Sequence, residues 1–209
     1  MLEQRDTNKI CLESRRQRGV GGFSLIEMLV AITLAGILTT VGVSSYQNIA
    51  TSYRISGEIN ELLGDMQFAR AEAIKEGQMV KICISSNAGA GGTPDCDGDT
   101  ASGWHSGWIV FPVTSPAQAA PNGAPSVLRA QTAFGGHDTL ADTSVGDPAI
   151  AVTFNREGLA NQLKSGDAAG GNALITLHDS SGKSANTRCL LITSVGAMKV
   201  VRNDYPGCV

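Results

Sequence analysis

Hydrophobic and polar residues divide the chain into three parts. Residues 1–22 are polar, residues 28–53 contain no charged residue, and the rest of the chain mixes apolar and polar positions. A helix of about 20 apolar residues crosses the roughly 30 Å hydrocarbon core of a bilayer. The pattern therefore predicts a membrane-spanning segment at residues 23–45. Because no second run is as apolar, it also excludes a transporter with several spans.

The helical pattern continues beyond this run. Between residues 46 and 76, apolar residues recur at intervals of three and four, and no proline occurs before Pro94. This spacing predicts one helix from Phe23 to about Glu76, ended by Gly77, with an apolar stripe that packs on the protein's own sheet. The stripe consists of Ile55, Ile59, Leu62, Leu63, Met66, Ala69 and Ala73. The charged residues are predicted to fill the other face: Glu58, Glu61, Asp65, Arg70, Glu72 and Glu76.

Residues 77–209 change to the alternating pattern of half-buried strands. A long helix followed by a run of strands predicts an α+β fold, in which the helix lies on an antiparallel sheet. Pro112 predicts a sheet edge or a bulge. The sequence leaves open whether the loop at residues 115–147 has a role. The predicted strands are 79–85, 107–113, 127–132, 150–154, 174–178, 188–193 and 198–202.

Composition narrows the classes of function. The 209 residues are 42% hydrophobic and 17% charged, with a formal net charge of −3. These values suit one ordinary domain with an appendage and exclude a disordered chain. The charge gives no basic signature for nucleic-acid binding.

The chain shows no pattern typical of catalysis or metal binding. Three alternating aspartates precede Thr100, where a calcium loop requires glycine, and no set of nucleophile, base and oxyanion donors is found. We therefore expect no enzymatic activity, no metal and no cofactor. The aspartates are Asp95, Asp97 and Asp99, and the histidines, which lack metal-ligand spacing, are His105, His137 and His178.

The polar N-terminal part carries a basic cluster that favours a cytoplasmic location for this end of the chain. The cluster consists of Arg15, Arg16 and Arg18. Two small residues, Gly21 and Gly22, lie before the apolar run. In a secretory signal the small residues of the cleavage site lie after the apolar run. A protease that cuts at the two glycines would leave the apolar helix on the mature protein. An uncut single-pass anchor is the alternative.

Glu27 is the only charged residue between Arg18 and Arg54. A carboxylate inside a membrane segment costs about 2.5–3.5 kcal/mol, so such a residue usually has a function or a partner. The simplest partner is a cation from a neighbouring copy, such as an α-amino group freed at Phe23. The alternative is that Glu27 reaches the nearby membrane interface.

Residues 22–27, with the sequence GFSLIE, precede the apolar helix and resemble the class III signal of type IV pilins and type II secretion pseudopilins. The resemblance implies that residues 1–22 are a leader, which a prepilin peptidase removes by cutting between Gly22 and Phe23. It also implies that Phe23 is N-methylated, and that Glu27 assists processing and sets the register during filament assembly.

The second half of the chain resembles the GspH/FimT family of minor pilins and pseudopilins. The resemblance implies a pilin-like fold and a non-enzymatic subunit of a type IV pilus or a type II secretion filament. It further implies a single-pass precursor in the bacterial inner membrane with a periplasmic domain, whose partners are the prepilin peptidase and other pilins or pseudopilins. The residues that carry it are Ala69–Lys75, Val80, Cys83, Trp104, Gly107–Phe111, Phe154, Gly158, Arg188, Cys189, Gly196 and Cys208.

Some FimT-like relatives bind DNA through a Gly-Arg-x-Arg loop, which corresponds here to residues 196–199 (GAMK), followed by Arg202. Lys199 and Arg202 are therefore the candidate DNA contacts. Without residues 1–22, the 16 basic and 19 acidic residues fall to 11 and 16, a formal charge of −5 that opposes DNA binding. A DNA-uptake pilin and an unprocessed periplasmic binding domain are the alternative functions.

Four cysteines remain once Cys11 is removed with the leader, and four cysteines allow three pairings. We predict the two pairings that close short local loops, Cys83–Cys96 and Cys189–Cys208. An even number of cysteines fits an oxidising periplasm. The alternative is that one pair stays as buried thiols.

Overall fold

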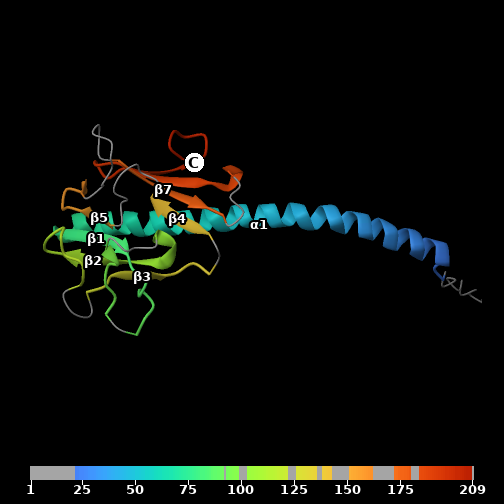
Figure 1. The fold of residues 1–209 in the computed structure, drawn as a ribbon, viewed down its shortest axis with the longest axis horizontal. Coiled ribbons are helices and arrows are strands. Elements are labelled where there is room, and N and C mark those ends of the chain that lie inside the picture. The colour runs from blue at the N-terminus through green and yellow to red at the C-terminus, as the bar shows by residue number, and fades with distance from the viewer. Residues whose placement is uncertain are drawn as a thin grey trace, which may run out of the picture. The chain divides into compact units, whose positions relative to one another are not determined.

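The computed structural model describes residues 22–91, 93–98, 103–121, 126–135, 138–142, 151–161, 172–179 and 184–208 (Figure 1). For residues 41–45 and 141–142 it describes the backbone alone. The predicted leader up to residue 21, Asp99, His137 and residues 143–147 lie outside the described residues. The chain forms two compact units, residues 1–45 and residues 46–209, and each is described by itself.

Helix α1 spans Leu25–Glu76, close to the predicted bounds. In the second unit its buried face consists of residues that are at most 1% exposed: Ile55, Ile59, Leu62, Met66, Ala69 and Ala73. The helix ends at Gly77, whose φ of 66° is the left-handed conformation that commonly stops a helix. Within residues 46–76 the helix therefore has one buried apolar face.

The strands form two antiparallel sheets, where the sequence predicted one. The five-stranded sheet has the order β3-β2-β1-β5-β6 and the four-stranded sheet the order β4-β7-β8-β9. The first sheet contains β1 (Met79–Ile84), β2 (Gly107–Val113), β3 (Arg129–Thr132), β5 (Ala151–Phe154) and β6 (Ala160–Asn161). The second contains β4 (Thr139–Asp142), β7 (Ala173–His178), β8 (Arg188–Ile192) and β9 (Met198–Arg202). Two short 3₁₀ helices, η2 (Trp104–Ser106) and η3 (Ser184–Asn186), precede β2 and β8.

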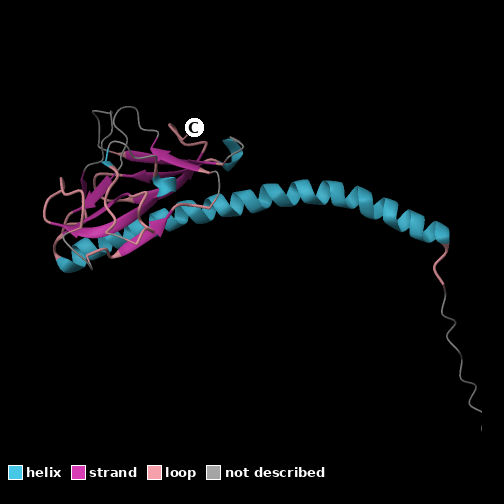
Figure 2. Ribbon diagram, turned by 60° about the horizontal axis from the view of Figure 1, so that its bottom comes forward, coloured by secondary structure: helices cyan, strands magenta, loops and turns pink. Residues whose placement is uncertain are grey.

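One hydrophobic core joins the second part of α1 to both sheets, and Figure 2 shows the helix running alongside the strands. From the first sheet the core takes alternate residues of β1, which are Val80, Ile82 and Ile84. From the second sheet it takes alternate residues of β7 and β8, including Ile175 and Leu190. The apolar stripe therefore packs on the protein's own sheets, as predicted, and the α+β fold class is confirmed.

Pro112 lies in the part of β2 that pairs with β1 but not with β3. Strand β3 pairs with β2 only from Gly107 to Val110, whereas Pro112 pairs with Val80 of β1 alone. A proline has no N–H to donate, so it is tolerated on this open side. Strand β2 lies between β3 and β1 in the sheet order, so the prediction of an edge holds for this end of the strand and not for the strand as a whole. By contrast, the short strands β4 and β6 were not predicted.

Candidate processing site and assembly surface

The backbone at the predicted cleavage bond is accessible in the described part of the chain. Gly22, Phe23 and Ser24 precede the helix without regular structure, and the Phe23 side chain is 76% exposed. A side chain at Gly22 would meet no heavy atom within 4 Å. A peptidase requires an uncovered segment outside regular structure, and residues 22–24 provide one.

Glu27 lies in the first turn of α1 and is exposed. The first turn of a helix carries unpaired N–H groups and a partial positive charge, which stabilise a nearby carboxylate. The first hydrogen bond of the helix runs from the Met28 N–H to the Ser24 carbonyl at 3.1 Å. Glu27 thus lies in the helix, four residues after Phe23, which precedes the helix.

The first part of α1 is apolar on every side. Its large apolar side chains are between 47% and 84% exposed: Leu25, Ile26, Met28, Leu29, Val30, Ile32, Leu34, Ile37 and Leu38. A helix that is hydrophobic all round is normally surrounded by protein or lipid. Within the described ranges, no helix has a long enough apolar stretch to cross a membrane. The span predicted at residues 23–45, which extends over undescribed side chains, stays a prediction.

The two candidate DNA contacts do not share a surface. Both lie on β9 and both are exposed, but they are three residues apart, and side chains alternate between the two faces of a strand. Lys199 stands opposite Leu191, whereas Arg202 stands opposite Arg188. The pKa of Arg188 is lowered by its burial and by the nearby charge of Arg202. The structure therefore does not bring Lys199 and Arg202 together.

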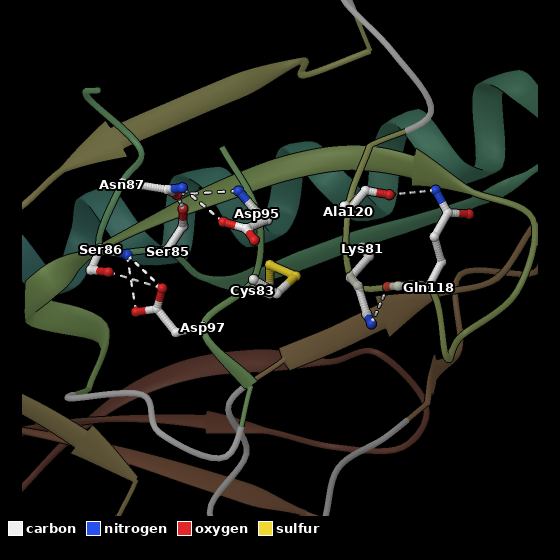
Figure 3. Close-up of a disulfide and its surroundings, with 10 residues drawn as sticks. Lys81, Cys83, Ser85, Ser86, Asn87, Asp95, Asp97, Gln118 and Ala120 are labelled. Carbon is white, nitrogen blue, oxygen red and sulfur yellow. Dashed lines mark hydrogen bonds between the residues drawn. A yellow bond between two sulfur atoms is a disulfide. The ribbon is translucent and has the colours of Figure 1, made fainter. Parts of the chain in front are cut away.

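Both predicted disulfides are present. Cys83 of β1 is bonded to Cys96, and Cys189 of β8 is bonded to Cys208 near the C-terminus. Cys83 belongs to a small apolar cluster on the outer face of the five-stranded sheet, with Ile109, Phe111 and Val113. The first disulfide therefore fastens a surface loop over this face, as Figure 3 shows.

The aspartates of this loop bind protein groups. The Asp97 carboxylate accepts hydrogen bonds at 3.0 Å from the Ser86 N–H and hydroxyl, and Asp95 accepts one at 2.7 Å from the Asn87 amide (Figure 3). Each carboxylate closes the loop after β1. Among the described residues, no group of three His, Cys, Asp or Glu side chains could hold a metal ion.

A buried amine on the same face was not identified from the sequence. Lys81 of β1 is only 5% exposed, and its Nζ donates to the Gln118 carbonyl at 2.7 Å (Figure 3). Burial lowers the pKa of this amine. Lys81 anchors a second loop, and the alternation of apolar and polar residues in β1 had already placed it on the face opposite Val80 and Ile82.

Asp65 corrects one prediction, because it does not lie on an exposed polar face. It is buried, its carboxylate accepts from the Trp108 indole N–H at 2.9 Å, and it pairs with Arg129 at 2.7 Å. The Arg129 guanidinium also lies over the Phe68 ring, 4.0 Å from its centre. These contacts tie α1 to β2 and β3.

Glu58 is a second charged residue that is partly buried. Its pKa is raised from 4.5 to about 7, first by burial and then by the negative charge of Asp138. The Asp138 side chain is fully buried and pairs at 2.9 Å with Arg54, one turn of helix from Glu58. This cluster joins α1 to the segment that leads into β4.

Arg70 links the helix to two tight turns. Its Nε donates to the Gly158 carbonyl at 3.0 Å, and its Nη2 contacts the Val195 carbonyl at 3.4 Å. Gly158 and Gly196 both have positive φ angles. A side chain at Gly158 would collide with Ile74, and one at Gly196 would collide with the Gly158 carbonyl and with Arg70. Glycine at both positions therefore lets the turns approach the helix, which explains two residues of the family resemblance.

Comparison with known proteins identifies the family. Residues 58–196 match the family model described as "Type II transport protein GspH", and residues 15–43 match the prokaryotic N-terminal methylation motif. The chain belongs to the GspH family. The match covers more than half of the chain, and it includes the second part of α1 and strands of both sheets.

Two relatives show what this GspH family member resembles. The type IV major fimbrial protein FimA of Dichelobacter nodosus is 28% identical over 86 residues, which are 39% of this chain and 53% of FimA. The match thus spans about half the length of that curated relative. The crystal structure of the type IV minor pilin FimU of Pseudomonas aeruginosa aligns with a TM-score of 0.50 at 17% identity, covering 73% of this chain and 91% of FimU. The fold of this GspH protein is pilin-like, and the predicted family of minor pilins and pseudopilins is confirmed.

Proposed function

We propose that this chain is a minor, non-catalytic subunit of a type IV filament, either a pilus or a type II secretion pseudopilus. The prepilin peptidase cuts it between Gly22 and Phe23 and methylates Phe23. The observation that carries the proposal is the match to the methylation motif over residues 15–43, which includes an exposed, non-helical segment at Gly22 and an uncovered apolar helix directly after it.

Before assembly, the apolar first part of α1 holds the precursor in the inner membrane. The domain formed by residues 46–209 then lies in the periplasm, which is oxidising and so favours its two disulfides. During assembly, the exposed apolar side chains of α1 exchange lipid for the helices of other subunits. Van der Waals packing drives such association.

Glu27 sets the register of this exchange. Once the leader is removed, the amino group of Phe23 is a cation at the end of the helix, and the carboxylate of Glu27 in a neighbouring subunit is its natural partner. Both charges are expensive in an apolar environment unless they pair. A subunit in the wrong register leaves them unpaired, so the pair selects one position.

The test is the N-terminus of the protein extracted from cell membranes. We expect the mature protein to begin with N-methylated Phe23, and we expect Gly22→Leu to keep the leader because a bulky residue replaces glycine at the cleavage site. Gly19→Leu, which alters the leader outside that site, is the matched control and should be cut normally. A wild-type protein that retains Met1 would contradict the proposal and indicate an unprocessed anchor.

Pilus and pseudopilus are distinguished by the defect that follows loss of the chain. Deletion of the gene should reduce surface pili in the first case and extracellular protein secretion in the second. For DNA uptake, no described contact brings the two candidate basic residues together. The structural role is therefore the one that the observations support.

A further inference from the structure

Strand β3 is the last strand of the five-stranded sheet, and the structure describes no strand on its outer side (Figure 1). In the adjacent β2, the Gly107 carbonyl accepts a hydrogen bond at 3.0 Å from the chain that follows β1. Backbone groups of successive residues point to opposite sides of a strand, so those of Trp108 point to β3, where Trp108 stands opposite Gln131. The N–H and C=O groups of Ala130 therefore point outward. The Thr132 carbonyl, on the same side, accepts from the Gln131 side chain at 3.3 Å.

The residues of β3 do not protect this open edge. Natural proteins usually protect an exposed edge with charged residues or proline. The one charged residue of β3, Arg129, is turned to Asp65 of α1 at 2.7 Å, and residues 130–132 are alanine, glutamine and threonine. By contrast, the edge strand β9 carries the exposed Lys199 and Arg202. Strand β3 is thus suited to pairing with a further strand.

A groove lies beside this edge, between β3 and α1, and we call it the β3 groove. It holds about 440 Å³, and its lining includes Asn60, Glu61 and Gly64 of α1 together with Ala130 and Gln131 of β3. A side chain added at Gly64 would meet no heavy atom within 4 Å. Small residues on both elements, Gly64 and Ala130, therefore leave room for the main chain of another segment.

The β3 groove contains an acid without a counter-charge. Asp65 is paired with Arg129, whereas no ion pair of the described residues includes Glu61. Partial burial and the negative charge of Asp65 raise the pKa of Glu61, since both disfavour its charged form. A cationic side chain placed in the groove would remove this disadvantage. The groove is therefore complementary to lysine or arginine.

We propose that the β3 groove binds an extended segment of another protein, which adds a strand to β3 and places a lysine or arginine side chain against Glu61. In strand addition, main-chain hydrogen bonds give affinity and alternate side chains give specificity. One residue of the added strand exchanges two hydrogen bonds with Ala130. The residues on either side of it turn their side chains toward α1 and Glu61. The proposed function is not needed for this inference, which concerns the folded domain alone.

The first experiment titrates the full-length protein, in detergent micelles, with the acetylated and amidated peptide Val-Lys-Val-Lys-Val. In an added antiparallel strand its central valine stands opposite Ala130, and both lysines face α1. Amide chemical shifts measured by NMR report weak binding, and we expect saturable changes at Ala130 and Thr132. The same peptide with an N-methyl group on its central valine should bind about ten-fold more weakly, because one edge hydrogen bond is lost.

Two results of this titration would overturn the proposal. One is the absence of saturable changes at Ala130 and Thr132 up to about 5 mM peptide, which is weaker than a specific site requires. The other is equal affinity of the methylated and unmethylated peptides, which would show that the main chain of β3 does not take part.

The second experiment removes the same hydrogen bond from the protein's side. Ala130→Pro deletes the outward N–H and no bond to β2, and proline is tolerated at such an edge position. Ala130→Val, which keeps the N–H, is the matched control. We expect about ten-fold weaker peptide binding for the proline variant and less than about a two-fold change for the valine variant. Equal binding by the two variants would contradict strand addition. Melting temperatures show whether both variants fold, and if Ala130→Pro does not, the methylated peptide decides.

The third experiment tests the charge of the partner. Glu61→Gln should weaken binding of the lysine peptide about three-fold, as expected for a largely exposed ion pair. Glu72→Gln, on the same helix but outside the lining of the groove, is the matched control and should leave binding unchanged. The peptide Val-Glu-Val-Glu-Val should bind more weakly than the lysine peptide. Equal affinity for the two peptides, or equal losses in the two variants, would overturn the assignment of a cationic partner.

Discussion

Helix α1 contains two stretches that bury apolar residues in different ways. Between Ile55 and Ala73, apolar residues occupy one stripe and are covered by the two sheets of the same chain. Between Leu25 and Leu38, apolar residues occupy every side and are exposed. The difference shows that the arrangement of apolar residues, more than their number, indicates whether a helix finds its partner within the chain or outside it.

The largest expected effect is on the free energy of unfolding, and it is tested by one substitution in each of the two stretches. Leu62→Ala removes a fully buried side chain and should destabilise the domain by about 2–5 kcal/mol. Leu29→Ala, in the exposed stretch, should change the free energy of unfolding by less than about 0.5 kcal/mol. Denaturant unfolding followed by fluorescence is suitable because Trp104 and Trp108 are both buried. Similar losses for the two variants would break the comparison.

A smaller effect is expected at the charged residue that the helix buries. Asp65→Ala leaves the Trp108 indole N–H without its acceptor and should cost about 2 kcal/mol. Asp65→Asn keeps an oxygen that can accept this bond, so it should cost about half as much. The same unfolding assay measures both variants. A neutral Asp65→Ala variant would show that the bond to Trp108 contributes nothing.

The exposed stretch also contains one charged residue, Glu27, as the buried stretch contains Asp65. Removal of the Glu27 carboxylate should affect filament assembly and not the folding of the domain. Glu27→Ala should reduce incorporation into filaments about ten-fold, equivalent to about 1.4 kcal/mol, with membrane extraction and unfolding unchanged. Glu27→Asp, which keeps the charge on a shorter side chain, serves as the comparison and should be less affected. Normal incorporation of Glu27→Ala would contradict the register role.

The smallest effect is the pH dependence that Glu58 introduces. Its pKa is about 7 in the folded domain against 4.5 for the ordinary group, so the folded state binds the extra proton between these values. Stability from this group is therefore present at low pH and lost as the pH rises from about 4.5 to about 7. Because Glu58 is only partly buried, the change should be about 1 kcal/mol.

The check is the melting temperature of the wild type and of Glu58→Gln at pH 5 and pH 8. The variant should lack this component of the pH dependence and should be the more stable protein at pH 8. Equal slopes for the two proteins would show that Glu58 does not titrate in this range.

Local patterns in the sequence predicted most of the fold. The three- and four-residue spacing gave α1, alternation gave the longer strands, and short loops gave both disulfides, because each of these depends on residues close together in the chain. Strands β4 and β6 were missed because they are short: β4 spans Thr139–Asp142 and β6 spans Ala160–Asn161. The pairing of β4 with β7 depends on residues more than thirty positions away.

Among the candidate functional residues, the N-terminal motif was identified from the sequence, whereas the surroundings of several charged residues were not. The segment from Gly22 to Glu27 is a local motif and was found at once. Asp65 was placed on the wrong surface because its partners, Trp108 and Arg129, come from distant strands. Lys199 and Arg202 were grouped by the resemblance to a Gly-Arg-x-Arg loop, whereas both lie on strand β9, where alternation separates them. Long-range packing decides such cases, and a linear pattern does not record it.

The bond between Cys189 and Cys208 has a mechanical consequence for a subunit under tension. A pull applied at the two ends of the chain passes through the two sulfur atoms, so β9 and the turn before it carry no load. The chain between the two cysteines, which are 19 positions apart, would span about 65 Å if fully extended, and it cannot extend while the bond is intact. Force spectroscopy with and without a reductant would display the difference.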